Sequence, residues 1–107
     1  MSSANMFSVY GRMTALPGRR DALIALLHEA FRASGDDSGL LTYSINTAPE
    51  DPDTIWMTQL WTDREAHDTT THSEAVATVS QRLPPLLAKQ PEGSYGHAVY
   101  VHGRTAE

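Results

Sequence analysis

Apolar side chains recur along this chain with two different periods. Side chains of a strand point alternately to the two faces of a sheet, whereas those of a helix return to one face every three or four residues. The period of two predicts four strands, at residues 7–15, 40–47, 54–61 and 94–102. The longer period predicts two helices, one from residue 19 to about 34 and one from residue 64 to 83, where Pro84 and Pro85 interrupt it.

The order of these elements is β-α-β-β-α-β, which is the order of the ferredoxin-like fold. We therefore predict an α+β domain in which four strands form an antiparallel sheet and both helices cover one face of it. Residues 48–53 include two prolines and form a six-residue turn, short enough to join the second and third strands as a hairpin. A chain of this length can bury about 65% of its unfolded surface, which suits one core. We expect a single domain over residues 1–107, with its core at about 7–102.

Large apolar side chains occur on both faces of the predicted sheet. Phe7, Val9 and Met13, for example, share one face of the first strand. The residues predicted on the opposite, uncovered face are Tyr10, Leu40, Trp56 and Leu60. Because the helices cover only one face, the other needs a partner, and a second copy of the chain is the simplest one. We predict a homodimer that forms through this sheet face.

The charge balance and the absence of cysteine narrow the classes of function. Eight Lys and Arg against thirteen Asp and Glu give a formal net charge of −5. Nucleic-acid binders and proteins that adhere to anionic membranes need a basic surface, so neither partner is expected. No cysteine is present, which excludes disulfides, thiolate zinc sites, iron–sulfur clusters and a cysteine nucleophile. We see no secretory signal and no apolar stretch of the ~20 residues that a membrane span needs, so we expect a cytoplasmic protein.

The five histidines do not have the spacing of metal ligands. His67 and His72 are five residues apart, which turns them about 140° away from each other on a helix. His97 and His102 are also five apart, so on a strand they point to opposite faces. No acidic residue joins either pair at ligand spacing. We therefore expect no metal site.

Three segments of the chain resemble the antibiotic biosynthesis monooxygenase domain, which belongs to the dimeric α/β barrel superfamily. They are residues 16–23 (LPGRRDAL), 38–43 (SGLLTY) and 59–67 (QLWTDREAH). The third is the most specific, because it is similar to the family's sequence of an acidic residue, a Trp two positions later, a turn and Glu-Ala. In this order and spacing, the segments extend the resemblance over nearly the whole chain, from Phe7 to His102.

The resemblance implies a homodimer in which two sheets form a barrel, and a small-molecule pocket in each subunit between the sheet and the helices. Several members of the family oxidise phenols, anthrones or quinols with molecular oxygen and use no flavin, haem or metal. Such a protein needs an apolar pocket, a base, and hydrogen-bond donors for the developing oxyanion. The expected partners are a second copy of the chain and a hydrophobic or aromatic small molecule, and no cofactor is expected.

Some positions depart from the pattern of the family. Gln59 stands where members commonly carry an acidic residue, and Thr70 stands where they often carry a histidine. The haem-degrading relatives place Asn, Trp and His at positions that correspond here to Gly11, Thr70 and Ser80. These differences argue against haem degradation.

An imidazole for the catalytic base is available on either side of Thr70. His72 and His67 both lie in the segment that the resemblance places against the pocket, and imidazole titrates near neutral pH. Either of them can serve as the base. The alternative is that both are solvated side chains on a polar helix face.

Four strand residues are candidates for binding a substrate. Trp61 and Tyr43 can stack on a planar aromatic ring, and Gln59 and Asn46 can donate a hydrogen bond to a carbonyl or phenolate oxygen. Alternatively, the rings belong to the core or the dimer interface, and the amides satisfy neighbouring backbone groups.

We therefore predict a cofactor-independent monooxygenase. The alternatives are a non-catalytic dimeric domain that binds a small molecule, and an isomerase on the same fold.

Overall fold

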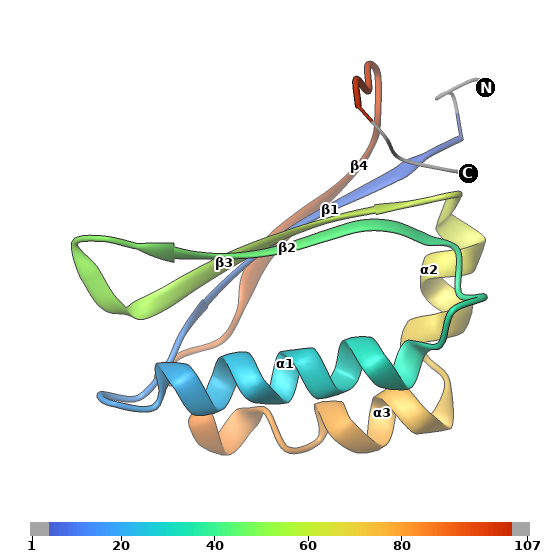
Figure 1. Cartoon of the computed structure of the whole chain (residues 1–107). Helices are drawn as coiled ribbons and strands as arrows, with labels where there is room; N and C mark the ends of the chain where they lie inside the picture. The colour runs from blue at the N-terminus through green and yellow to red at the C-terminus, as the bar shows by residue number, and fades with distance from the viewer. Residues whose placement is uncertain (1–4, 104–107) are drawn as a thin grey trace.

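The computed structural model describes residues 5–103 and confirms the predicted α+β, ferredoxin-like architecture. Within this range, four antiparallel strands stand in the order β2-β3-β1-β4, and α1 and α3 lie against one face of the sheet, here named the covered face (Figure 1). The opposite face is the open face. No helix in the described range is long and apolar enough to cross a membrane. The elements are β1 (Phe7–Thr14), α1 (Arg20–Ser34), β2 (Leu40–Ala48), β3 (Asp51–Trp61), α2 (Arg64–Thr71), α3 (Glu74–Ser80), the 3-10 helix η1 (Pro84–Leu86) and β4 (Glu92–His97).

The core forms between the covered face and α1. Alternation along β3 brings Ile55 and Met57 to the covered face, and helical spacing along α1 brings Leu23 and Leu27 to the side that meets them. The side chains of Leu23 and Ile55 are completely buried. Burial of one such side chain contributes roughly 1.5–3 kcal/mol. The two apolar stripes that the sequence predicts therefore pack directly against each other.

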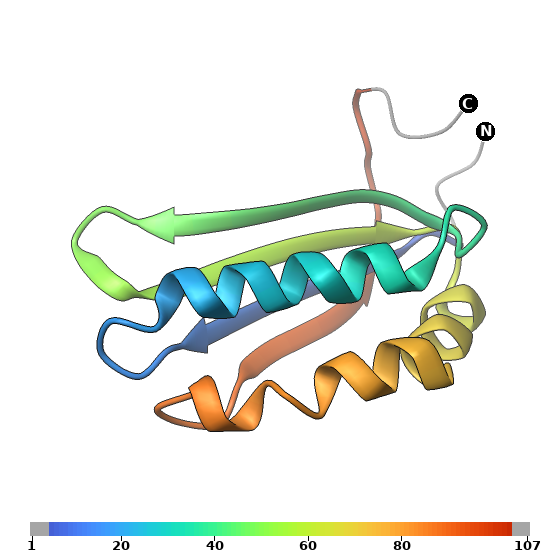
Figure 2. The same cartoon turned by 60° about the horizontal axis from the view of Figure 1, so that its bottom comes forward.

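The segment predicted as one helix over residues 64–83 forms two helices, so that expectation is corrected. Asp63 begins α2, because its carboxylate accepts a hydrogen bond from the backbone N–H of Ala66 at 2.8 Å. Ser73 begins α3 in the same way, since its hydroxyl accepts from the N–H of Val76 at 3.3 Å. The second cap lets the chain change direction. As a result α3 lies beside α1 under the sheet, while α2 stands at one end of the sheet (Figure 1, Figure 2).

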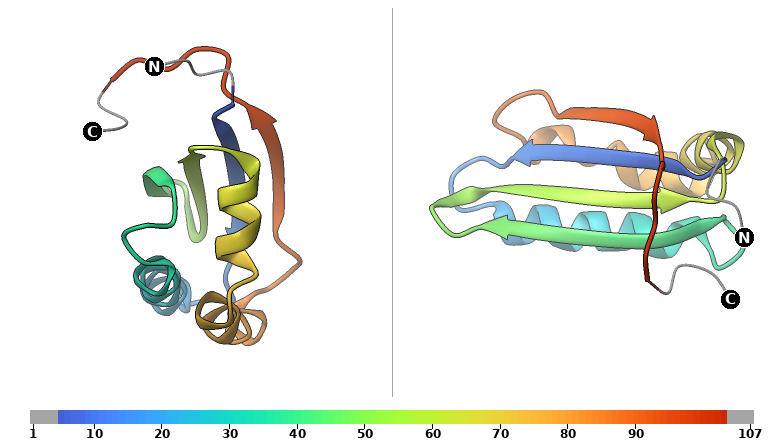
Figure 3. Two further views of the ribbon diagram at one scale, coloured as in Figure 1. Left: turned by 90° about the vertical axis from the view of Figure 1, so that its right-hand side faces the viewer. Right: turned by 90° about the horizontal axis from the view of Figure 1, so that it is seen from above.

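The last strand is shorter than the sequence predicts. It ends at His97 instead of residue 102, because its partner β1 begins at Phe7, which is paired with His97. The N–H of Ala98 still donates to the carbonyl of Met6 at 2.9 Å. The chain then leaves the sheet and runs across the strand direction on the side away from α1 and α3 (Figure 3).

The turn between β2 and β3 is also tighter than the predicted 48–53 turn, because two residues connect the strands. Asp51 begins β3, and its carboxylate accepts from the hydroxyl of Thr54 at 2.6 Å and from the backbone N–H of Asp53 at 3.1 Å. These hydrogen bonds, that of Thr54 first, lower the pKa of the Asp51 carboxyl. They tie the side chain of Asp51 to the residues that follow it at the start of β3.

The open face carries three of the four apolar residues predicted for it. Tyr10 and Trp56 are 42% and 37% exposed, and their ring centroids lie 6.2 Å apart. Leu60 has the parity of the same face but is buried. Leu40 is the exception, because a register shift just after it pairs it with Trp61 and turns it to the covered face.

Candidate active site

Two hollows lie on the covered face of the sheet. The first, named the inner hollow, has a volume of about 190 Å3 and lies between α1, α3 and the sheet. The second, named the edge hollow, has a volume of about 370 Å3 and lies beside α2, along β1 and β4. The side chains that line both hollows are Met13, Met57, Gln59 and Thr71. The two hollows therefore adjoin, and Gln59 lies at the boundary between them.

Gln59 has one end of its amide occupied and the other end almost free. Alternation along β3 places Gln59 and Trp61 on the same face, and the indole N–H of Trp61 donates to Oε1 of Gln59 at 2.9 Å. The amide nitrogen Nε2 lies 3.5 Å from the thioether sulfur of Met57, which is a weak acceptor. The amide nitrogen of Gln59 is therefore a hydrogen-bond donor available to an oxygen atom of a ligand.

Tyr43 lines the inner hollow directly opposite Gln59 in the pairing of β2 with β3. Its ring packs edge-on against Phe31 of α1, with centroids 5.3 Å apart. Burial raises the pKa of the Tyr43 hydroxyl to about 12. The phenol consequently stays protonated at neutral pH and can donate a hydrogen bond into the inner hollow.

His67 is a buried side chain of α2 and lines the edge hollow. Aromatic rings from three strands surround its imidazole, with centroids 5.1 Å away for Phe7, 5.3 Å for Trp61 and 5.4 Å for Tyr95. Its Nδ1 lies 2.8 Å from Oδ1 of Asp68, the next residue of the helix. The imidazole therefore has a carboxylate on one side and an apolar, aromatic environment on the other.

The two other predicted site residues lie elsewhere. His72 is exposed at the carboxyl end of α2 and is not among the described residues that line either hollow. Asn46 lies on the open face, where its amide donates to Oγ of Ser44 and to the carbonyl of Trp56, each at 3.2 Å. The structure thus brings four of the six candidates together and separates these two from them. Among residues 5–103, no three His, Asp or Glu side chains gather in a way that could hold a metal ion.

Sequence reasoning did not assign a place in the pocket to two glycines that line the edge hollow. Gly11 and Gly93 are paired across β1 and β4, and both line the hollow. Neither has a side chain: Met57 packs over Gly11, 3.4 Å from where a Cβ would lie, and a Cβ on Gly93 would collide with the carbonyl oxygen of Tyr10 at 2.5 Å. The alternation along β1 could have indicated this, because it places Gly11 at an inward-facing position where the residue has no side chain.

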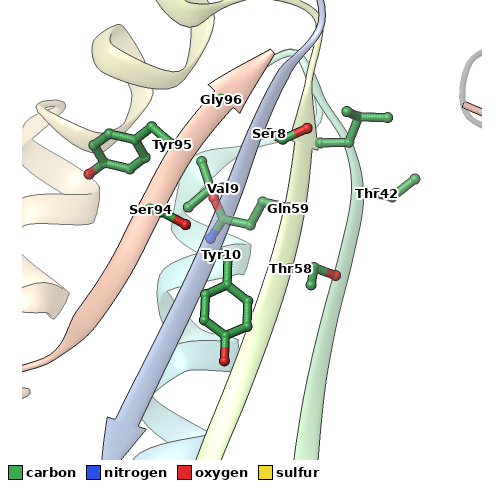
Figure 4. Close-up of a pocket in the computed structure, with 10 residues that line it drawn as sticks. Ser8, Val9, Tyr10, Thr42, Thr58, Gln59, Ser94, Tyr95 and Gly96 are labelled. Carbon is green, nitrogen blue, oxygen red and sulfur yellow. The ribbon is translucent and has the colours of Figure 1, made fainter. Parts of the chain in front are cut away.

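A third hollow, about 430 Å3 in volume, lies over the open face (Figure 4). Hydroxyl-bearing side chains make up much of its wall: Ser8, Tyr10, Thr42, Thr58 and Ser94. No described residue of this wall has a side chain that titrates near neutral pH. The covered face, not the open face, therefore supplies a candidate base.

Known proteins share both the sequence pattern and the fold of this chain. The sequence profile of the family "Antibiotic biosynthesis monooxygenase" matches residues 6–82. A solved structure from Chloroflexus aurantiacus, assigned to the antibiotic biosynthesis monooxygenases, is 35% identical and covers 92% of this chain and 98% of its own, with a TM-score of 0.80. No curated protein matches the chain.

More distant solved structures have the same fold. SnoaB, a cofactor-independent oxygenase from Streptomyces nogalater whose mutant form was solved, is 13% identical over 92% of this chain and 97% of its own, with a TM-score of 0.81. A Nitrosomonas europaea protein of unknown function is 17% identical over 94% of this chain and 96% of its own, with a TM-score of 0.76. At these identities the likeness establishes the fold and leaves the chemistry to the residues of the site.

Proposed function

The chain belongs to the antibiotic biosynthesis monooxygenase family, and from that premise we propose that it oxidises an aromatic, phenolic or quinol-like small molecule with molecular oxygen and without a bound cofactor. One observation carries the proposal: the buried imidazole of His67 and the available amide N–H of Gln59 border the same hollow. A base and a donor for a developing oxyanion are the two groups that this chemistry requires of a protein.

In the proposed reaction, His67 takes a proton from an acidic O–H or C–H of the substrate, and Gln59 donates a hydrogen bond to the oxygen that becomes negative. The resulting anion passes one electron to oxygen, the two radicals combine to a peroxide anion, and this anion takes the proton back from His67. In an anthrone, loss of water from that peroxide turns the CH2 group into C=O. One oxygen atom enters the product, the other leaves as water, and the substrate supplies all four electrons.

The dimensions and the lining of the hollows suit such a ligand. The edge hollow, at about 370 Å3, falls within the range of roughly 300–1,000 Å3 that is typical of small-molecule sites. Tyr95 lines the edge hollow and is exposed, so it offers an aromatic face to a planar ring, whereas Trp61 is buried in the wall of the inner hollow and orients Gln59 through its indole N–H. Tyr43 adds a neutral donor on the far side of Gln59.

Oxygen uptake with a panel of anthrones and hydroquinones tests the proposal. Uptake together with incorporation of one atom from labelled oxygen into the product, followed by mass spectrometry, is the expected result. A reaction that proceeds equally well without oxygen would instead indicate an isomerase.

Gln59, which replaces an acidic residue of the family, favours the other alternative, a non-catalytic binding domain. In that case the probes bind, as followed by tryptophan fluorescence, and no oxygen is consumed.

Gly11→Val tests whether the edge hollow binds the substrate. The new side chain would push Met57, which lies 3.4 Å from the Cβ position and lines the edge hollow, so we expect KM to rise about 10-fold, a loss of about 1.4 kcal/mol, while kcat stays within a few-fold. Gly96→Val on β4 is the matched control, because Gly96 borders the open-face hollow instead of the edge hollow and nothing in the same subunit lies within 4 Å of a Cβ there. An unchanged KM for Gly11→Val would place the substrate outside this hollow.

We further propose that two copies of the chain associate through their open faces. The half-exposed rings of Tyr10 and Trp56 form the apolar part of that face, and a partner sheet would remove them from water. Sedimentation equilibrium at micromolar concentration should give about twice the mass of 11.7 kDa for the wild type. Trp56→Glu should give a monomer, because a carboxylate would then have to be buried in the interface.

Leu16→Glu is the control for the dimer, since Leu16 is also about 40% exposed but lies in the loop after β1. It should leave the mass at that of the dimer. A monomeric wild type, or dimers of equal stability for both variants, would contradict association through the open face.

A further inference from the structure

We propose that Asp68 is a positioning residue for His67, because its carboxylate holds the proton of the imidazole on Nδ1 and leaves Nε2 as the proton acceptor. The use of Nε2 as a catalytic base rests on the proposed function. The tautomer itself is a property of the protein alone and can be measured without a substrate.

The contact between the two residues has the geometry of a hydrogen bond to a charged group. His67 Nδ1 and Asp68 Oδ1 are 2.8 Å apart. The histidine side chain is 10% exposed and that of the aspartate is 45% exposed, so the carboxylate sits at the rim and the ring lies inside. A hydrogen bond with one ionised partner is shorter and stronger than a neutral one. It therefore fixes both the ring orientation and the position of the proton.

The charge of Asp68 decides which partner donates. The hydrogen bond with His67, and then the positive charge of Arg64, hold the pKa of the Asp68 carboxyl below its usual value. Arg64 lies one turn earlier on α2, with its Nε 3.5 Å from Oδ2 of Asp68. The carboxylate is thus ionised at neutral pH and has only acceptors, so Nδ1 of His67 must carry the proton. In the neutral ring, Nε2 is then unprotonated.

The other ring nitrogen faces a different environment. In the described range, Nδ1 is the ring nitrogen of His67 for which a hydrogen bond is found, and Nε2 has none. The indole N–H of Trp61, the polar hydrogen of a ring packed against His67, already donates to Gln59. Because His67 also lines the edge hollow, Nε2 is the nitrogen left to meet a proton of a bound molecule.

Nitrogen-15 NMR of the histidine side chains in the full chain tests the inference. In the wild type we expect a pyrrole-like resonance for Nδ1 of His67 and a pyridine-like resonance for Nε2. Asp68→Asn and Asp68→Ala remove the negatively charged acceptor, so the proton should move toward Nε2, the tautomer that a free neutral histidine side chain prefers. The exposed His72 is an internal control in every spectrum. Asp36→Asn, in the loop after α1, is the matched control substitution and should change neither histidine.

An Nε2-protonated His67 in the wild type, or an unchanged tautomer in both Asp68 variants, would overturn the inference. Turnover provides a second readout: Asp68→Asn should lower kcat and leave KM within about two-fold, because the residue lies outside the described walls of the edge hollow. The loss should not exceed the roughly 10²–10⁴-fold that a general base contributes. If the wild type consumes no oxygen, the proposed function fails while the NMR result still decides the tautomer.

Discussion

His67→Gln should lower kcat for oxygen uptake by about 10²–10⁴-fold, the usual contribution of a general base, while KM changes by no more than a few-fold. Glutamine approximates the size and polarity of the imidazole, so it can occupy the space between Phe7, Trp61 and Tyr95, but it cannot take up a proton. Initial rates from an oxygen electrode, at saturating and at limiting probe, separate the two constants. Circular dichroism melting shows whether the variant is folded.

His72→Gln is the matched control, because it makes the same substitution five residues away at an exposed position. Its rates should stay within about two-fold of the wild type. If the two variants lose activity equally, or if His67→Gln keeps the wild-type kcat, then His67 is not the base. In the second case the buried imidazole would have a structural role among the aromatic rings.

The alternation of β3 explains why much of the site can be predicted from the sequence. A period of two places Gln59 and Trp61 on the face that also carries Ile55 and Met57, whatever the details of the helices. The pairing of Tyr43 with Gln59 depends in addition on the register of the hairpin, which the two-residue turn and the shift after Thr47 set, and the predicted 48–53 turn would have paired Tyr43 with Thr58. The face of each residue within one strand therefore follows from parity, whereas its neighbour on the next strand follows from the register.

The same rule also separates Asn46 from the pocket. Asn46 has the parity of Thr42 and Ser44, opposite to that of Tyr43, and its amide bonds lie on the open face. Grouping it with Gln59 relied on residue type instead of strand position. The choice between an inward and an outward amide was therefore available from the sequence.

The sequence pattern could not decide in this way which of His67 and His72 is buried. Both lie in a polar stretch, and their exposure depends on where α2 ends and how it meets the sheet. That in turn depends on the cap at Ser73, which separates α2 from α3. The position of Leu40 also depends on a local irregularity, because a bulge moves this residue to the covered face. Such features arise from tertiary packing, which a one-dimensional pattern does not contain.

Gly39→Ala should lower the free energy of unfolding by about 2–5 kcal/mol and disturb the site from a distance. Gly39 has a φ of +91°, a conformation that costs a residue with a Cβ roughly 1–2 kcal/mol. A Cβ at this position would also lie 2.8 Å from the Cβ of Ala66 and from Oγ1 of Thr62, and overpacking of this kind costs about 1–3 kcal/mol more. Urea denaturation measures the sum.

The consequence for function follows from where the collision occurs. Ala66 precedes His67 on α2, so a side chain at Gly39 pushes against the part of the helix that holds the candidate base. Gly18→Ala separates strain from collision, because Gly18 has a φ of +79° and no atom within 4 Å of its Cβ position. It should cost only about 1–2 kcal/mol and leave turnover unchanged. Equal losses of stability in the two variants would mean that the collision with α2 adds nothing to the destabilisation. An unchanged kcat in Gly39→Ala would show that the base tolerates movement of its helix.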